Sequence, residues 1–222
     1  MNISEDFKEN LYLFIILISM SFSIVIQSYL NPNGFLSPDS TNYLSVAKNL
    51  LNGDGYVLGH DLRREPFAVW PVGYPTLIFI VAKISNLSVF WASKLTNILL
   101  ILGILITIRK TFRRQSYLYA LVLFFSSFIC IYSYTWSETL FIFLLLLFCL
   151  SIYSLLKTEK PNNFNYILIF LTSISLFMSR YIGAFSFGVI AILALYYLFI
   201  ENNKKRSIKL ILISFGAIIV TS

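Results

Sequence analysis

Three charged residues stand within or beside long apolar stretches, and they are the residues of this chain best suited to chemistry. Asp39 opens a polar loop, and Arg180 interrupts a long apolar run. Glu138 is the only charged residue in positions 116–156. A charge beside apolar helix is costly unless it has a partner or a task, and carboxylates are common proton acceptors in catalysis. Asp39 and Glu138 are therefore candidate catalytic groups, although an acid in a first helical turn also suits the helix dipole.

The composition indicates a multi-span membrane protein. The chain has 222 residues, of which 58% are apolar and 12% are charged, whereas a soluble domain carries roughly 25% charged residues. The net charge of +7 comes from cations at the ends of apolar runs, which is typical of topology determinants rather than of nucleic-acid binding. His60 is the only histidine and is expected to be an exposed loop residue, and Cys130 and Cys149 are expected to be small core residues, so no zinc site is predicted.

Apolar runs predict an all-α fold with about six spanning helices and a partial seventh. A span needs about 20 residues to cross a core of about 30 Å. The expected spans cover residues 11–30, 89–108, 117–134, 137–156, 164–179 and 182–200, with the partial one beginning at Leu210. The acidic N-terminal segment and the absence of a small-residue cleavage site favour a retained first helix over a signal peptide.

Two parts of this pattern leave alternatives open. Residues 76–84 are apolar but too few to cross, which predicts a re-entrant or interfacial helix. Residues 164–200 are too many for one span, and the charge and glycine of residues 179–183 predict a turn between two helices, with one long tilted helix as the alternative. Because the last run is too short to span, we expect a single transmembrane domain over residues 1–222 that is the N-terminal part of a longer protein.

The distribution of Lys and Arg predicts the orientation. With the N-terminus in the cytoplasm, 11 of the 17 cations face inside. They are Lys8, Arg109, Lys110, Arg113, Arg114, Lys157, Lys160, Lys204, Lys205, Arg206 and Lys209. This bias places residues 31–75 outside the cytoplasm, on the same face as the turns that carry Glu138 and Arg180.

The loop of residues 31–75 is expected to contain an interfacial helix. Ser37 can cap a helix whose first position is Pro38, and apolar residues then follow at helical spacing. Gly53 and Gly55 are expected to end this helix. Asp39 would then stand in the first turn, at the mouth of the loop.

Several short motifs resemble a known family. Residues 39–43 (DSTNY), 47–56 (AKNLLNGDGY) and 70–75 (WPVGYP) resemble the first extracytoplasmic loop of GT-C-type glycosyltransferases. This superfamily includes dolichyl-phosphate-mannose protein mannosyltransferases and bacterial aminoarabinose transferases. Residues 137–141 (SETLF) and 180–183 (RYIG) resemble two later motifs of the same family, in the same order.

The resemblance implies an integral-membrane enzyme of the cell envelope. Such an enzyme moves a sugar from a polyprenyl-phosphate lipid to an acceptor hydroxyl, with inversion. It implies that Asp39 is the base and that Glu138 orients the acceptor or helps to hold a metal. It further implies that Arg180 faces the lipid phosphate, with Arg63, Arg64 and Lys83 as weaker candidates. Tyr43 and Tyr74, which belong to the matching motifs, are expected to contact substrate.

This chain differs from many members of the family at one position, and that position concerns the cofactor. Many relatives carry an acidic pair at the first-loop position, whereas Ser40 follows Asp39 here. A divalent metal is therefore a candidate cofactor whose requirement stays open. The expected partners are a lipid-linked sugar donor, membrane lipids, and an acceptor that is a glycan, a lipid or a protein, with no nucleic acid.

Two other functions compete with this interpretation. A transporter or flippase of lipid-linked sugars would carry polar residues or broken helices at mid-membrane in several spans. The sequence offers Asn97 and Gly103 and little else of this kind. A non-catalytic or truncated membrane scaffold is the second alternative, in which Asp39 would be replaceable.

Overall fold

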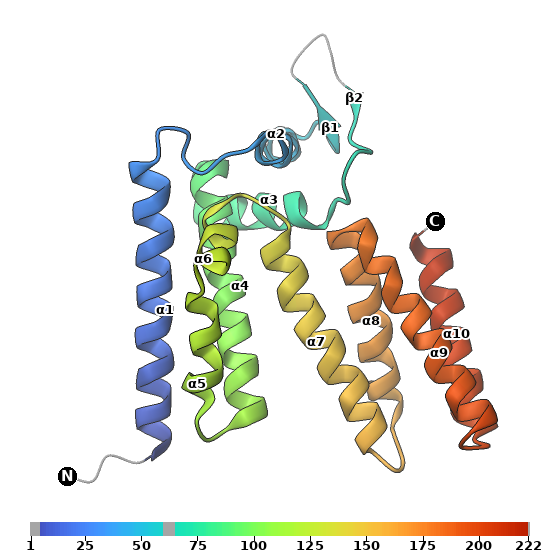
Figure 1. The fold of residues 1–222 in the computed structure, drawn as a ribbon. Helices are drawn as coiled ribbons and strands as arrows, with labels where there is room; N and C mark the ends of the chain where they lie inside the picture. Colours follow the sequence, from blue (N-terminus) through green and yellow to red (C-terminus); the bar gives the residue numbers. More distant parts are fainter. Residues whose placement is uncertain (1–4, 60–64, 222) are drawn as a thin grey trace. The chain divides into compact units, whose positions relative to one another are not determined.

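The computed structural model describes residues 5–59 and 65–221. This part of the chain is nearly all helical (Figure 1), as the sequence predicts. The exception is a pair of two-residue antiparallel strands, β1 (Val57–Leu58) and β2 (Glu65–Pro66). The positions of His60, Arg63 and Arg64 lie outside the described residues, so the expectations for them stay untested.

The helices fall into two compact units. Unit 1 comprises Met1–Ala68 and Tyr74–Phe143, and unit 2 comprises Val69–Gly73 and Leu144–Ser222. The remaining elements, in chain order, are α1 (Glu5–Leu30), α2 (Pro38–Asn52), α3 (Gly73–Ser85), α4 (Val89–Phe112), α5 (Ser116–Ala120), η1 (Leu121–Phe124), α6 (Ser126–Ser133), α7 (Glu138–Lys157), α8 (Asn163–Ser179), η2 (Tyr181–Ala184), α9 (Phe185–Phe199) and α10 (Lys204–Thr221).

Within the described residues, four helices are long and apolar enough to cross a membrane. They are α1, α4, α7 and the continuous segment Tyr181–Phe199, and a bent pair of helices brings the number to five if it forms one span. The 26 residues of α1 extend about 39 Å at about 1.5 Å per residue, which exceeds a hydrocarbon core of about 30 Å. Helices α3 and α8 are shorter apolar helices, so six spans remain a prediction.

The expected third span is broken rather than continuous. Segments Ser116–Phe124 and Ser126–Ser133 meet at an angle of 71°. Phe125 has an extended conformation at the junction, with φ −59° and ψ 136°, and its carbonyl accepts bonds from the amides of Phe128 and Ile129. Sharp bends occur at Pro or at Gly/Ser pairs, and the Ser126-Ser127 pair supplies that feature here.

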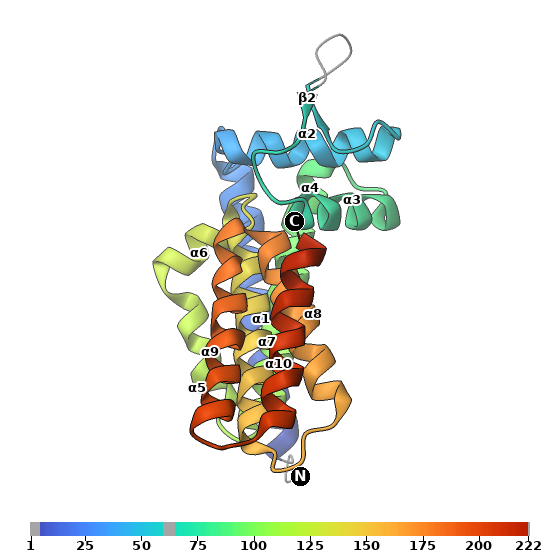
Figure 2. The same cartoon turned by 90° about the vertical axis from the view of Figure 1, so that its right-hand side faces the viewer.

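The expected helix in the first loop is present with its predicted ends. The Ser37 hydroxyl accepts a bond from the Ser40 amide, and Pro38 takes the first helical position of α2. Gly53 closes the helix with a left-handed conformation, φ 84°, which glycine adopts without a Cβ penalty. In unit 1, α2 and α3 run across the direction of α1 and α4 (Figures 1 and 2), as expected of helices that do not span.

Unit 2 divides residues 164–200 where the sequence predicts a turn. Helix α8 ends at Ser179, Arg180 is extended with φ −155° and ψ 137°, and η2 then leads into α9. The expectation that both cysteines are core residues is wrong, because Cys130 and Cys149 are exposed on the helix surfaces. A helix that is apolar all round does not reveal from its sequence which face packs inward.

Candidate functional site

Asp39 lies in the first turn of α2 and is exposed to solvent. No hydrogen bond or ion pair joins its carboxylate to any residue of the described chain. The helix dipole stabilises a negative charge at this position. An exposed carboxylate at the start of a well-capped helix is accessible to an incoming hydroxyl and is a candidate to accept its proton.

Two side-chain hydrogen bonds join the start of α2 to the residues just before α7. The Trp136 indole Nε1 donates to the Ser37 Oγ at 2.7 Å. The Tyr43 hydroxyl donates to the Ser137 Oγ at 3.2 Å. Because Asp39 and Glu138 stand in the first turns of these two helices, the bonds hold the two acidic helix ends near each other within unit 1.

Tyr43 and Tyr74 are buried residues that support this site. Their rings meet edge-on, with centroids 5.4 Å apart. The Tyr74 hydroxyl donates to Asn97 Oδ1 at 2.9 Å. Burial raises the pKa of Tyr74 above its ordinary value, and the nearby Glu138 carboxylate raises it further, so the hydroxyl stays protonated and keeps donating. These contacts describe two residues that position the site, and their expected contact with substrate stays a prediction.

Two buried polar residues of α4 fix the segment that leads to Glu138. Lys94 Nζ donates to the Ser133 carbonyl at 2.6 Å. Asn97 Nδ2 donates to the carbonyls of Tyr132 and Tyr134, each at 2.8 Å. Lys94 and Asn97 are three positions apart, so they share one helix face.

These bonds satisfy the last carbonyls of α6, which have no partner inside their own helix. A cation is also favourable at a helix C-terminus. Lys94 is not among the eleven cations that the sequence places in the cytoplasm, and the sequence pattern gives it no other role. Helical spacing is the only signal that could have pointed to it, because its partners are backbone oxygens.

Unit 2 brings two of the quoted motifs together at the end of α8. A Cβ at Gly73 would lie 2.5 Å from the Met178 carbonyl oxygen, and one at Gly183 would lie 2.4 Å from the Leu176 carbonyl. Both positions therefore require glycine for close backbone approach. The Arg180 amide donates to the Leu176 carbonyl, and the Arg180 side chain is half-buried in this turn.

The described residues hold no group of three or more His, Cys, Asp or Glu side chains that could bind a metal ion. The site residues divide between the two units, with Asp39, Tyr43, Tyr74 and Glu138 in unit 1 and Arg180 in unit 2. The metal requirement therefore stays open.

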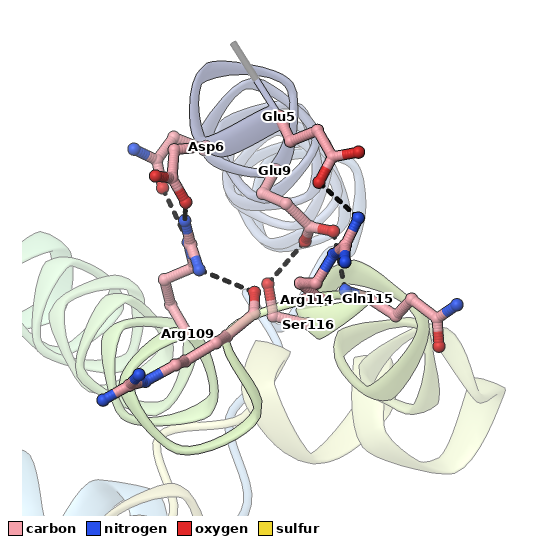
Figure 3. A network of polar contacts seen from close by, with 9 residues as sticks. Glu5, Asp6, Glu9, Arg109, Arg114, Gln115 and Ser116 are labelled. Carbon is pink, nitrogen blue, oxygen red and sulfur yellow. Dashed lines mark hydrogen bonds and ion pairs between the residues drawn. The ribbon is translucent and has the colours of Figure 1, made fainter.

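The opposite end of unit 1 carries carboxylates in a different setting (Figure 3). Asp6 pairs with Arg109 at 2.6 Å, and Glu5 pairs with Arg114 at 2.5 Å. Glu9 accepts from the Ser116 hydroxyl at 2.8 Å and from the Gln115 amide at 2.6 Å. These bonds join the first turns of α1 to the connection between α4 and α5.

Comparison of the chain with family models, curated proteins and solved structures found no match. The geometry of the two acidic helix ends and the motifs of the sequence are therefore the features that point to a function.

Proposed function

We propose that this chain is a membrane glycosyltransferase, or part of one, that uses a polyprenyl-phosphate-linked sugar. The acceptor is a hydroxyl group of a glycan, a lipid or a protein. The proposal includes six spans, a cytoplasmic N-terminus, and residues 31–75 on the extracytoplasmic face. One observation carries most of the support, namely the pair of hydrogen bonds that joins the helix ends bearing Asp39 and Glu138.

In the proposed reaction Asp39 accepts the proton of the acceptor hydroxyl as its oxygen attacks the anomeric carbon. The new carbon–oxygen bond forms on the face opposite the breaking bond to the phosphate, which inverts the configuration. The electron pair of the broken bond leaves with the polyprenyl phosphate. Glu138 orients the acceptor, and Arg180 stabilises the phosphate charge, with Arg63 and Arg64 as further candidates.

The buried polar groups of α4 argue against a transport path. Lys94 and Asn97 are almost fully buried, and their nitrogens donate to carbonyl oxygens of the same unit. Groups that line a path for a polar substrate need to offer hydrogen bonds to that substrate. In this unit those groups hold helices together.

The test is transfer of radiolabelled sugar from polyprenyl-phosphate donors in membranes that contain the full chain. We expect Asp39→Asn to lower transfer by about 100-fold or more, because a positioned base contributes about 10²–10⁴-fold. Glu138→Gln should also lower transfer. Asp54→Asn, the same change at the other end of α2, is the matched control and should keep transfer near the wild-type rate.

Unchanged transfer in Asp39→Asn would remove the assignment of the base. An absence of transfer from every donor, with the wild-type chain correctly folded, would favour the scaffold interpretation.

A further inference from the structure

The end of unit 2 formed by the α7–α8 and α9–α10 connections contains a small pocket, and four of its eight lining residues are cations. Its volume is about 250 Å³, and its lining includes Lys160, Tyr166, Lys205, Arg206, Lys209 and one acid, Glu159. The two connections lie at the same end of the unit in both views (Figures 1 and 2). We call this feature the basic pocket.

In the part of the chain that the structure describes, no ion pair joins a cation of the basic pocket to an acid. Arg206 donates to the carbonyls of Thr158 and Glu159 and to the Tyr197 hydroxyl, all of which are neutral oxygens. Lys209 donates to Asn163 Oδ1 at 3.0 Å and lies over the Tyr166 ring. Within the described chain, no ion pair joins Lys160 or Lys205 to an acid, and both side chains are exposed.

Hydrogen bonds hold two of the four cations of the pocket, Arg206 and Lys209, in place. The neutral bonds of Arg206 fix its guanidinium between the two connections, while Lys160 and Lys205 stay available to a ligand. Three of the five N–H donors of this guanidinium make bonds to the protein, and the other two remain for the oxygens of a phosphate. The volume lies below the roughly 300–1,000 Å³ of drug-sized sites, so it suits a single phosphate group better than a large ligand.

The position of the pocket in the fold indicates which kind of molecule carries that phosphate. It lies where α7 ends and where the apolar segment Tyr181–Phe199 ends, and both are long and apolar enough to span a membrane. The ends of such helices meet the headgroup layer. Basic pockets between helices at this depth bind anionic headgroups. We propose that the basic pocket binds the phosphate of an anionic phospholipid headgroup.

Native mass spectrometry of the purified full chain tests this proposal, independently of any transferase activity. The chain in detergent is mixed with equal amounts of phosphatidylglycerol and phosphatidylcholine, and the retained lipid is measured. We expect preferential retention of phosphatidylglycerol. The double variant Lys160→Gln/Lys205→Gln, which removes two exposed cations and no bond within the fold, should lose about 25-fold in affinity for phosphatidylglycerol, or roughly fivefold per charge.

The matched control is Lys8→Gln/Lys110→Gln, which removes two exposed cations from unit 1. Its affinity should change by less than about twofold, because neither lysine lines the basic pocket. An equal loss in this control would overturn the proposal in favour of general charge attraction. Equal retention of both lipids would overturn it as well. If excess inorganic phosphate displaces phosphatidylglycerol, the ligand of the pocket is a soluble phosphate and not a lipid, which would overturn the proposal.

Discussion

The carboxylates at the two ends of unit 1 differ in whether they have a partner within the protein. At one end, Glu5, Asp6 and Glu9 contact Arg114, Arg109 and Ser116, so each carboxylate has a partner (Figure 3). At the other end, Asp39 is exposed and lacks a partner in the described chain, and the helix that carries it is held by bonds between neutral side chains.

This difference separates structural carboxylates from candidate chemical ones. When an acid is paired with a cation, the cation offsets the charge of the carboxylate and restricts the position of its side chain. An acid whose position is fixed by its helix, and whose oxygens stay available, can exchange a proton with a substrate. The two ends also differ in how firmly they are held, because buried hydrogen bonds contribute more to stability than exposed ion pairs do.

The largest expected effect on stability is at Asn97. Asn97→Ala removes the bonds to the carbonyls of Tyr132 and Tyr134 and the acceptor for the Tyr74 hydroxyl. We expect the free energy of unfolding to fall by about 2–4 kcal/mol, since each bond contributes about 0.6–1.5 kcal/mol. Thermal unfolding in detergent measures the loss.

Thr107→Val on the same helix serves as the control for this change. Its hydroxyl bonds only to the Gly103 carbonyl within α4. The control should cost less than about 1 kcal/mol. Equal losses in both variants would mean that the Asn97 bonds do not hold this end of unit 1.

A smaller effect is expected where α2 meets the segment before α7. Trp136→Phe removes the bond to Ser37 while keeping a ring beside Tyr134, whose centroid lies 4.2 Å from that of Trp136. We expect a loss of about 1 kcal/mol, and faster amide exchange in the first turn of α2.

A double-mutant cycle with Ser37→Ala sharpens this result. Because Ser37 also caps α2, its single substitution costs an additional amount, and only the coupling of the two changes reports the bond. A coupling free energy of about 0.5–1.5 kcal/mol is expected. A coupling of zero would show that the two helix ends are not joined in this way.

The smallest effect is expected in the ion pairs at the opposite end. The side chains of Arg114 and Glu5 are 80% and 73% exposed, so solvent screens their attraction. Arg114→Ala should change the free energy of unfolding by less than about 0.5 kcal/mol at physiological salt. A large loss that persists in high salt would contradict the distinction between the two ends.

The sequence predicted the features that depend on local chemistry. The Ser37 cap, the first-position Pro38 and the closing Gly53 all act within a few residues, and the structure confirms the helix between them. The turn at Arg180 was predicted for the same reason. The candidate site residues and the family resemblance are not tested by the fold and stay predictions.

Features that depend on contacts far along the chain were missed. The bonds of Lys94 and Asn97 reach carbonyls more than 30 positions away, and backbone oxygens leave no signature in a sequence. The bend at Phe125 was missed because residues 117–134 contain no proline or glycine to mark a break. The exposure of Cys130 was missed because hydropathy does not distinguish a lipid-facing surface from a packed one.

The central claim is that the paired carboxylates at one end of unit 1 are structural and that Asp39 at the other end is catalytic. One paired measurement tests this claim most directly. Asp39→Asn and Asp6→Asn are the same chemical change at opposite ends, and sugar transfer and thermal unfolding are measured for both in one membrane preparation. We predict that Asp39→Asn loses about 100-fold in transfer and less than about 1 kcal/mol of stability, and that Asp6→Asn keeps transfer and also loses less than about 1 kcal/mol of stability. Equal transfer in the two variants, or loss of transfer in Asp6→Asn alone, would contradict the claim.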